Sequence, residues 1–328
     1  MKEGKMSKSV GNIVYPMDVV NEYGLDALRY YLTTSSAPGM DLRFDEDKVK
    51  STWNFINKLW NASRFVLLNL DGMKEVTLKD LRDEDKWILT KYEEVLKSTI
   101  KHMDKYEFNL VGTELYSFIW DDFCSSYIEF AKFNLDNNTT KSVLYTVLTG
   151  IIKMLHPFMP FVTEEIYQML PIKDADSIMI SEYPKYDKTM NYEEEYLKVN
   201  DKLEFIRKYR NILKENNIYG DYQVKLNFED TLTIKMLKLQ DRLVAGSKKT
   251  PFDVKHKELE AIIYYDKVIT EEEKELKEKQ INDLKASISK RENLLNNEGF
   301  VSKAPANLVE NEKKKLKEEK ELLESLIK

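Results

Sequence analysis

Apolar side chains recur every three or four residues along most of this 328-residue chain, and that spacing restricts it to a mainly helical fold. The spacing predicts long helices over about 47–70, 84–105, 109–134 and 139–155. A fifth, short helix is predicted to begin with Thr163 as its N-cap. The connections between these helices are short, so we expect them to pack as an antiparallel bundle.

The pattern changes twice beyond the bundle. Residues 191–216 have the charged amphipathic pattern of a helix, whereas the alternation over 222–228 and the β-rich run 261–265 predict strands. From about residue 270 onward, apolar residues at helical and seven-residue spacing flank a loop with glycine and proline. This arrangement predicts an antiparallel coiled-coil hairpin.

The expected fold class is therefore mainly α, and the chain divides into four predicted parts. These parts are a loop with short helices (1–47), the helix bundle with a trailing linker (48–190), a small α/β connecting module (191–268) and the coiled-coil hairpin (269–328).

Composition excludes several classes of protein. One cysteine, Cys124, rules out a disulfide framework and a cysteine-based zinc site, and the three histidines are too far apart to form a local metal cluster. The ten glycines are never closer than seven residues apart, so glycine-rich nucleotide-binding motifs are absent. No apolar run is long enough to span a membrane, and no signal peptide is present. We therefore expect a cytoplasmic protein.

The segment Lys5-Met6-Ser7-Lys8-Ser9 has the most distinctive chemistry in the sequence. Two ammonium groups on a mobile loop can neutralise the negative charge that develops on a transferring or leaving phosphate. The alternative is a solvated terminus that happens to carry lysines. Composition alone does not decide between these two interpretations.

The same segment, followed by Val10-Gly11-Asn12, resembles the KMSKS signature loop of class I aminoacyl-tRNA synthetases. Further segments narrow the resemblance to the valyl-tRNA synthetase family, and the last of them is similar to the tip of that family's C-terminal arm. They are Pro38–Phe44, Asn57–Phe65, Trp120–Cys124, His156–Phe161 and Asn297–Pro305.

The resemblance implies the C-terminal portion of such an enzyme, with the KMSKS loop, an anticodon-binding bundle and a coiled-coil tRNA-binding arm. It implies tRNA(Val) and an N-terminal catalytic and editing part as partners. ATP, with Mg, would be a substrate. No metal site and no membrane contact are expected in this chain, which would be monomeric. Lys8 would contact the ATP phosphates, and Lys5 and Ser7 would shape the loop. Because this sequence lacks a HIGH-type histidine motif, we expect the isolated chain to be inactive in valine activation.

Candidate tRNA contacts lie on the off-core face of the 47–70 helix. Lys58 and Phe65 fall on that face, and Phe65 could stack an unpaired base while the adjacent Arg64 contacts phosphate or a base edge. The alternative is that Phe65 packs against a neighbouring helix. The opposite stripe, predicted as core, contains Trp53, Ile56, Trp60 and Leu67.

In the predicted hairpin, Phe300 and Lys303 stand at the loop and are candidates for tRNA contact. The lysines of 313–317 could follow a phosphate backbone, but glutamates follow at once, so a solvated coiled-coil surface is the simpler interpretation. Three other functions remain open. They are a non-catalytic tRNA-binding module, the same region of an isoleucine or leucine enzyme, and a structural helical protein that oligomerises through 270–328.

Overall fold

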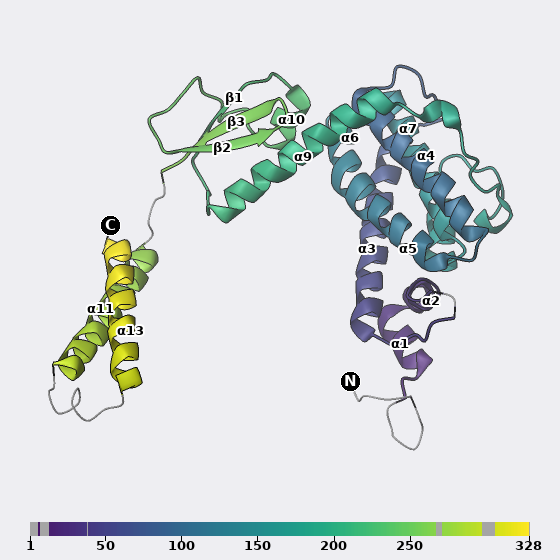
Figure 1. The fold of residues 1–328 in the computed structure, drawn as a ribbon. Coiled ribbons are helices and arrows are strands. Elements are labelled where there is room, and N and C mark those ends of the chain that lie inside the picture. The colour runs from purple at the N-terminus through teal and green to yellow at the C-terminus, as the bar shows by residue number, and fades with distance from the viewer. Residues whose placement is uncertain (1–5, 7–12, 38, 267–270, 297–305, 328) are drawn as a thin grey trace. The chain divides into compact units, whose positions relative to one another are not determined.

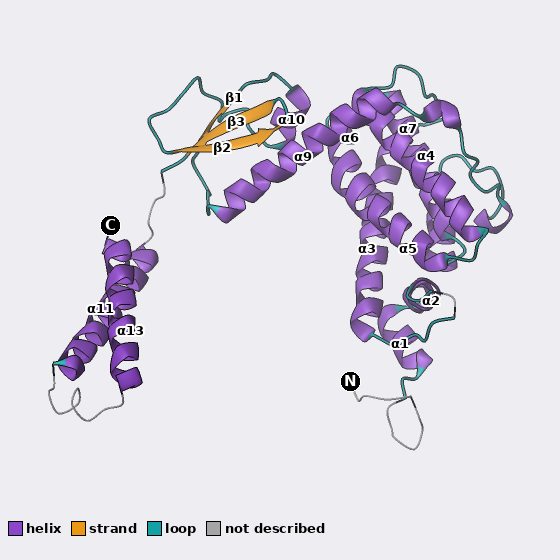
Figure 2. Cartoon of the chain, viewed as in Figure 1, coloured by secondary structure: helices purple, strands orange, loops and turns teal. Residues whose placement is uncertain are grey.

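Helices make up most of the chain, and the strands are confined to one small sheet (Figure 2). The computed structural model describes residues 6, 13–37, 39–266, 271–296 and 306–327. The chain forms two compact units, Met1–Tyr264 and Tyr265–Lys328. Within the described ranges, no helix is both long and apolar enough to cross a membrane. The mainly helical fold class is confirmed.

Two short helices, α1 (Pro16–Tyr23) and α2 (Leu25–Thr34), precede the bundle (Figure 1). Pro16 is at the first position of α1, where its missing N–H costs no hydrogen bond. Gly24 ends α1 with φ of 83°, a conformation that favours glycine, and its N–H donates to Val20 O at 2.9 Å. The apolar faces of α1 and α2 pack against the start of the next helix in a shared core.

The bundle contains most of the longer helices of the first unit, and α5, η1 and α6 follow one another in it as one continuous helical rod whose middle part, η1, is a π-helix. Ser125 Oγ donates to Trp120 O at 2.6 Å, and Ser126 Oγ donates to Asp121 O at 2.8 Å. The rod corresponds to the single helix predicted over 109–134, but the wider π-turn was not predicted. The elements of the bundle are α3 (Glu46–Asn69), α4 (Asp83–Met103), α5 (Phe108–Ser117), η1 (Phe118–Tyr127), α6 (Ile128–Ala131), α7 (Asn138–Leu155), α8 (Pro160–Gln168), and the 3-10 turns η2 (Ile178–Ile180) and η3 (Lys188–Met190).

The predicted core face of α3 was wrong for its two tryptophans, although Leu59, Ser63 and Leu70 of the same helical spacing are buried. Trp53 is 42% exposed and Trp60 is 37% exposed. Leu59, one residue before Trp60, is fully buried, because α2 and the rod pack on the face that Leu59 occupies. One residue turns an α-helix by about 100°, which carries Trp60 out of the core. The buried residues of α3 are Val49, Thr52, Phe55, Leu59, Ala62, Ser63 and Val66.

The start of α8 is capped from another helix, not by Thr163 as predicted. Asp26 of α2 accepts hydrogen bonds from Val162 N at 2.7 Å and Phe161 N at 3.3 Å. Thr163 lies inside α8, and its hydroxyl donates to Met159 O at 2.7 Å. Burial raises the pKa of Asp26, although both backbone N–H groups oppose that shift. This carboxylate therefore ties α2 to α8.

We expect Asp26→Ala to lower the free energy of unfolding by about 1–2 kcal/mol, because it removes a cap from two N–H groups. Asp26→Asn keeps one acceptor oxygen and should lose less. Urea denaturation followed by circular dichroism measures both variants. Equal stability of the wild type and Asp26→Ala would contradict this role.

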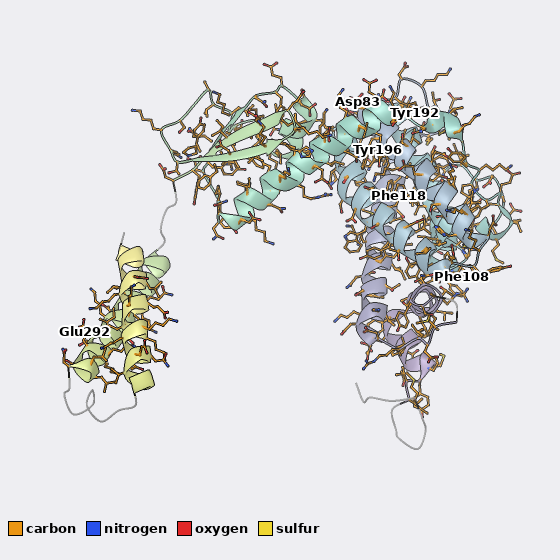
Figure 3. The ribbon with its side chains drawn as sticks, in the orientation of Figure 1. Asp83, Phe108, Phe118, Tyr192, Tyr196 and Glu292 are labelled. Carbon is orange, nitrogen blue, oxygen red and sulfur yellow. The ribbon has the colours of Figure 1, made fainter. Side chains whose placement is uncertain are left out.

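The predicted α/β module is present, and its sheet has the antiparallel order β1-β3-β2. The strand β2 was not predicted. The helix α9 contacts both α4 and β2, so it joins the bundle to the sheet. Asp83 and Tyr196, labelled in Figure 3, lie at the α4–α9 contact, where Lys198 Nζ is 2.6 Å from Asp83 Oδ2. The elements are α9 (Glu193–Glu215), β1 (Gln223–Leu226), α10 (Thr231–Met236), β2 (Pro251–His256) and β3 (Leu259–Tyr264).

The second unit contains the helices α11 (Glu271–Leu295) and α13 (Ala306–Ile327), which pack against each other as predicted. Ile288 and Val309 are buried. Arg291 bridges the two helices through ion pairs with Glu312 and Glu319, two residues seven positions apart on α13. The pair is thus held by an apolar contact and a charged one.

Candidate nucleic-acid interface

The predicted loop and tip residues cannot be placed. Lys5, Ser7 and Lys8 lie outside the described residues, and so do Phe300 and Lys303. The candidates that the structure does place are the three on α3.

Lys58 bridges α3 and η1. Its Nζ lies 3.8 Å from the centre of the Trp120 ring, and it donates to Trp120 O at 3.1 Å and to Ser125 Oγ at 2.9 Å. Burial lowers the pKa of Lys58, although nearby acidic groups oppose that shift. The ammonium is thus already occupied within the protein.

Phe65 and Arg64 lie near the C-terminal end of α3. Phe65 is half-buried, and Lys132 Nζ lies 5.7 Å from the centre of its ring. Lys132 also pairs with Glu129 at 2.6 Å. Arg64 is exposed, and no described carboxylate forms an ion pair with it. Of the three candidates on α3, Arg64 is therefore the most available to an outside anion.

All but one of the aromatic residues of η1 and α6 form part of the bundle core. Phe118, Phe123, Tyr127 and Phe130 are buried, whereas Trp120 is half-buried and stacks on Tyr116 with ring centres 5.6 Å apart. This stack continues inward, because Tyr116 contacts the buried Phe55 with ring centres 4.9 Å apart. The half-buried face of Trp120 is covered by Lys58.

Two carboxylates buried in the first unit have structural partners. Asp85 accepts from Tyr127 Oη at 2.7 Å, and Glu93 accepts from Asp187 N at 2.8 Å. Burial raises the pKa of the Cys124 thiol to about 12, so this thiol is a poor nucleophile at neutral pH. Burial also lowers the pKa of His156, which disfavours its charged form at the C-terminal end of α7. Among the described residues, no cluster of His, Cys, Asp and Glu could hold a metal ion.

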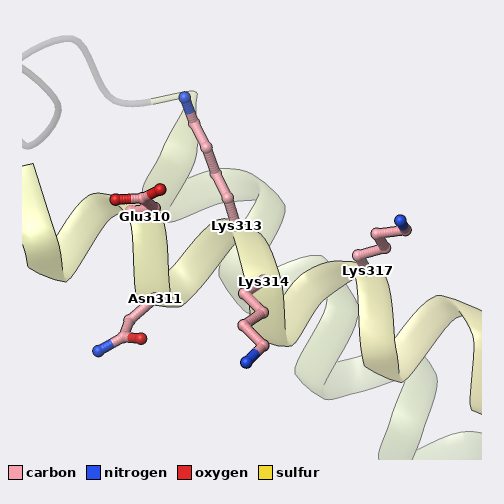
Figure 4. Close-up of a pocket in the computed structure, with 5 residues that line it drawn as sticks. All are labelled: Glu310, Asn311, Lys313, Lys314 and Lys317. Carbon is pink, nitrogen blue, oxygen red and sulfur yellow. The ribbon is translucent and has the colours of Figure 1, made fainter.

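On α13, three lysines surround a shallow hollow together with Glu310 and Asn311 (Figure 4). Lys313 and Lys314 form no ion pair with any described residue, and Lys317 lies 4.0 Å from Glu321. The seam with α11, where Arg291 bridges to Glu312 and Glu319, holds its own ion pairs. The second unit therefore offers cations to an outside partner.

Comparison with known families covers most of the chain. Residues 1–65 match the class I (M) tRNA synthetases, and residues 85–227 match the anticodon-binding domain of tRNA ligases. Residues 270–328 match the tRNA-binding arm of valyl-tRNA synthetase. Valine–tRNA ligase from Bacillus cereus is 41% identical over 95% of this chain, and that from Listeria innocua is 42% identical over 96%. The chain belongs to the valine–tRNA ligase family.

It spans only 38% of the length of these relatives and is homologous to their C-terminal region. Among solved structures, a LeuRS–tRNA–LeuAMS complex from Agrobacterium radiobacter matches 57% of this chain and 23% of its own chain, with 19% identity and a TM-score of 0.48. Two parts of this chain, residues 85–227 and 270–328, thus match families that are named for anticodon binding and for tRNA binding.

Proposed function

We propose that this chain grips tRNA(Val) for a valine–tRNA ligase and supplies the KMSKS loop for ATP-dependent valine activation. The observation that supports this most strongly is the presence, in one chain, of matches to both the anticodon-binding domain and the valyl-specific arm. The division of the chain into residues 1–47, 48–190, 191–268 and 269–328 belongs to this proposal. The protein would be a cytoplasmic monomer that works with an N-terminal catalytic and editing part.

In this proposal, Lys8 contacts the ATP phosphates. Its ammonium would neutralise charge on the leaving pyrophosphate as the valine carboxylate attacks, an electrostatic contribution that grows towards the transition state. Lys5 and Ser7 would hold the loop in the shape that brings Lys8 to the phosphates. Mg would accompany ATP as part of the substrate.

On the bundle, Phe65 and Arg64 would contact the anticodon loop. Phe65 offers a partly accessible ring for a base, and the exposed Arg64 guanidinium can bind phosphate or a base edge. Lys58 would act by fixing Trp120 and Ser125 of η1 against α3, because its ammonium contacts both of these residues. On the arm, Phe300 and Lys303 would contact the tRNA from the tip.

We expect Phe65→Ala to weaken tRNA(Val) binding by about 1–3 kcal/mol, the usual contribution of base–aromatic stacking. Filter binding measures the affinity, and thermal unfolding measures the fold. If the variant lost stability while each folded molecule kept its affinity, Phe65 would be a packing residue instead.

The isolated chain should not catalyse valine-dependent ATP–pyrophosphate exchange, because the histidine motif of the family's catalytic part is absent from the sequence. Addition of an N-terminal part from a relative should restore exchange. Exchange by the purified chain alone would refute this part of the proposal. A failure of the N-terminal part to restore activity would favour a tRNA-binding module without a catalytic role.

A further inference from the structure

The helix α3 has an unusual charge distribution. Its first two residues, Glu46 and Asp47, are acidic, but from Lys48 to Asn69 it contains four basic residues and no Asp or Glu. In the whole chain, by contrast, acidic residues outnumber basic ones 57 to 51. Three of the four cations are exposed, and the fourth, Lys58, is bound to η1. Beyond its acidic first turn, the outer surface of α3 is therefore a cationic strip without carboxylates of its own, on a protein of net charge −6.

Two large indoles stand on this strip. Trp53 and Trp60 are seven residues, or about two helical turns, apart, with Asn57 between them and Arg64 one turn beyond Trp60. Within the described part of the chain, neither indole N–H has a hydrogen-bond acceptor and neither ring has an aromatic or cationic partner. Both indoles are therefore partly accessible to an outside partner.

We propose that Trp53, Asn57, Trp60 and Arg64, here called the tryptophan face, bind unpaired RNA bases and the adjoining phosphates. This inference rests on the proposed tRNA-binding function and extends it from Arg64 to Trp53, Asn57 and Trp60, which lie outside the candidate set. Every nucleobase has a π-face that an indole can stack on, and asparagine and arginine side chains hydrogen-bond base edges and phosphates.

The tryptophan face is distinct from the flank that contains Phe65. The five residues from Trp60 to Phe65 correspond to a rotation of about 140° around the helix. The Phe65 flank is partly used by internal contacts, since Lys58 is bound to Trp120 and Lys132 covers the Phe65 ring. The tryptophan face has no such internal partners among the described residues.

Charge selects RNA as the occupant of this face. A polyanion binds more tightly to a surface that has cations and no carboxylates. The binding of another protein does not require that carboxylates be absent. The half-exposed indoles add sequence-tolerant stacking that does not depend on salt. RNA with unpaired bases satisfies both features of the face.

The test uses the full chain and two probes, the anticodon stem-loop hairpin of tRNA(Val) and intact tRNA(Val). Trp53→Ala and Trp60→Ala are each expected to weaken binding about 5- to 150-fold, which corresponds to the loss of one stacked base. The slope of log affinity against log salt should not change, because no phosphate contact is removed. Arg64→Ala should reduce that slope by about 1.

Trp60→Phe should recover part of the affinity, and unfolding midpoints should stay near that of the wild type because both indoles are exposed. Phe161→Ala is the matched control, since Phe161 is an aromatic residue of α8 with 61% exposure.

If the wild type binds both probes and the two Trp variants bind them as tightly as the wild type, the tryptophan face is refuted while the proposed function stands. If the wild type binds neither probe, both fail. If the variants keep RNA affinity but lose association with a separately expressed N-terminal part, the face is a protein contact and the inference is overturned.

Discussion

Lys8→Ala in a complete valine–tRNA ligase that carries this C-terminal region is expected to lower valine-dependent ATP–pyrophosphate exchange by about 10²–10³-fold. That is the usual effect of removing one group that stabilises developing charge. The expectation follows from the position of Lys8 in the KMSKS segment and from the match of residues 1–65 to class I synthetases. Steady-state exchange at saturating valine and ATP measures the effect.

The affinity of the Lys8→Ala enzyme for tRNA(Val) should remain within about twofold of the wild-type value, because an exposed charge on a separate loop adds little to a many-contact interface. Lys50→Ala, which removes an exposed lysine of α3, is the matched control and should leave exchange unchanged. Equal exchange rates for the wild type and Lys8→Ala would remove Lys8 from the activation step.

Trp87→Ala is expected to lower the free energy of unfolding by about 3–5 kcal/mol. Trp87 is fully buried on α4, its ring packs edge-on against Phe130, and its Nε1 donates to Asn200 Oδ1 of α9 at 2.9 Å. The substitution opens a cavity and also leaves the Asn200 amide without its partner. Urea denaturation of the full chain, followed by circular dichroism, measures the loss.

Trp53→Ala is the control for Trp87→Ala, because it removes the same side chain from an exposed position. It should cost less than about 1 kcal/mol. The helical spacing alone would assign Trp53 to the core and predict a large loss. Similar losses for the two variants would therefore contradict the orientation of α3 described above.

The sequence predicts the helices of this protein well, because their apolar spacing is long and regular. It does not predict which side of α3 is buried, since α3 is apolar on more than one side. Trp53 and Trp60 then suit either a core or an exposed face, and only the neighbours on the Leu59 side decide. The same ambiguity hides the π-helix in the rod, whose apolar residues lie on most sides and give no clear phase.

Contacts between residues that are distant in the sequence were not predicted either. The cap on α8 comes from Asp26, 134 positions before Pro160, so the local Thr163 was the natural but wrong choice. Lys58 shows the same limit at the candidate site. Its position on an off-core face suggested an exposed cation, whereas the structure places its ammonium against Trp120 and Ser125. The strand β2 alternates apolar and charged residues only over Phe252–Lys255, so its strand pattern was present in the sequence but short, and it was missed.

The most direct test of the account is the equilibrium binding of the intact chain to tRNA(Val), tRNA(Ile) and tRNA(Leu). Measurements between about 50 and 200 mM salt would separate the electrostatic contribution from the rest. The account predicts that tRNA(Val) binds most tightly and that its affinity falls as salt rises. No affinity for any tRNA at low salt, together with dimerisation through residues 270–328, would contradict the account. Tighter binding of tRNA(Ile) or tRNA(Leu) would contradict its valine specificity.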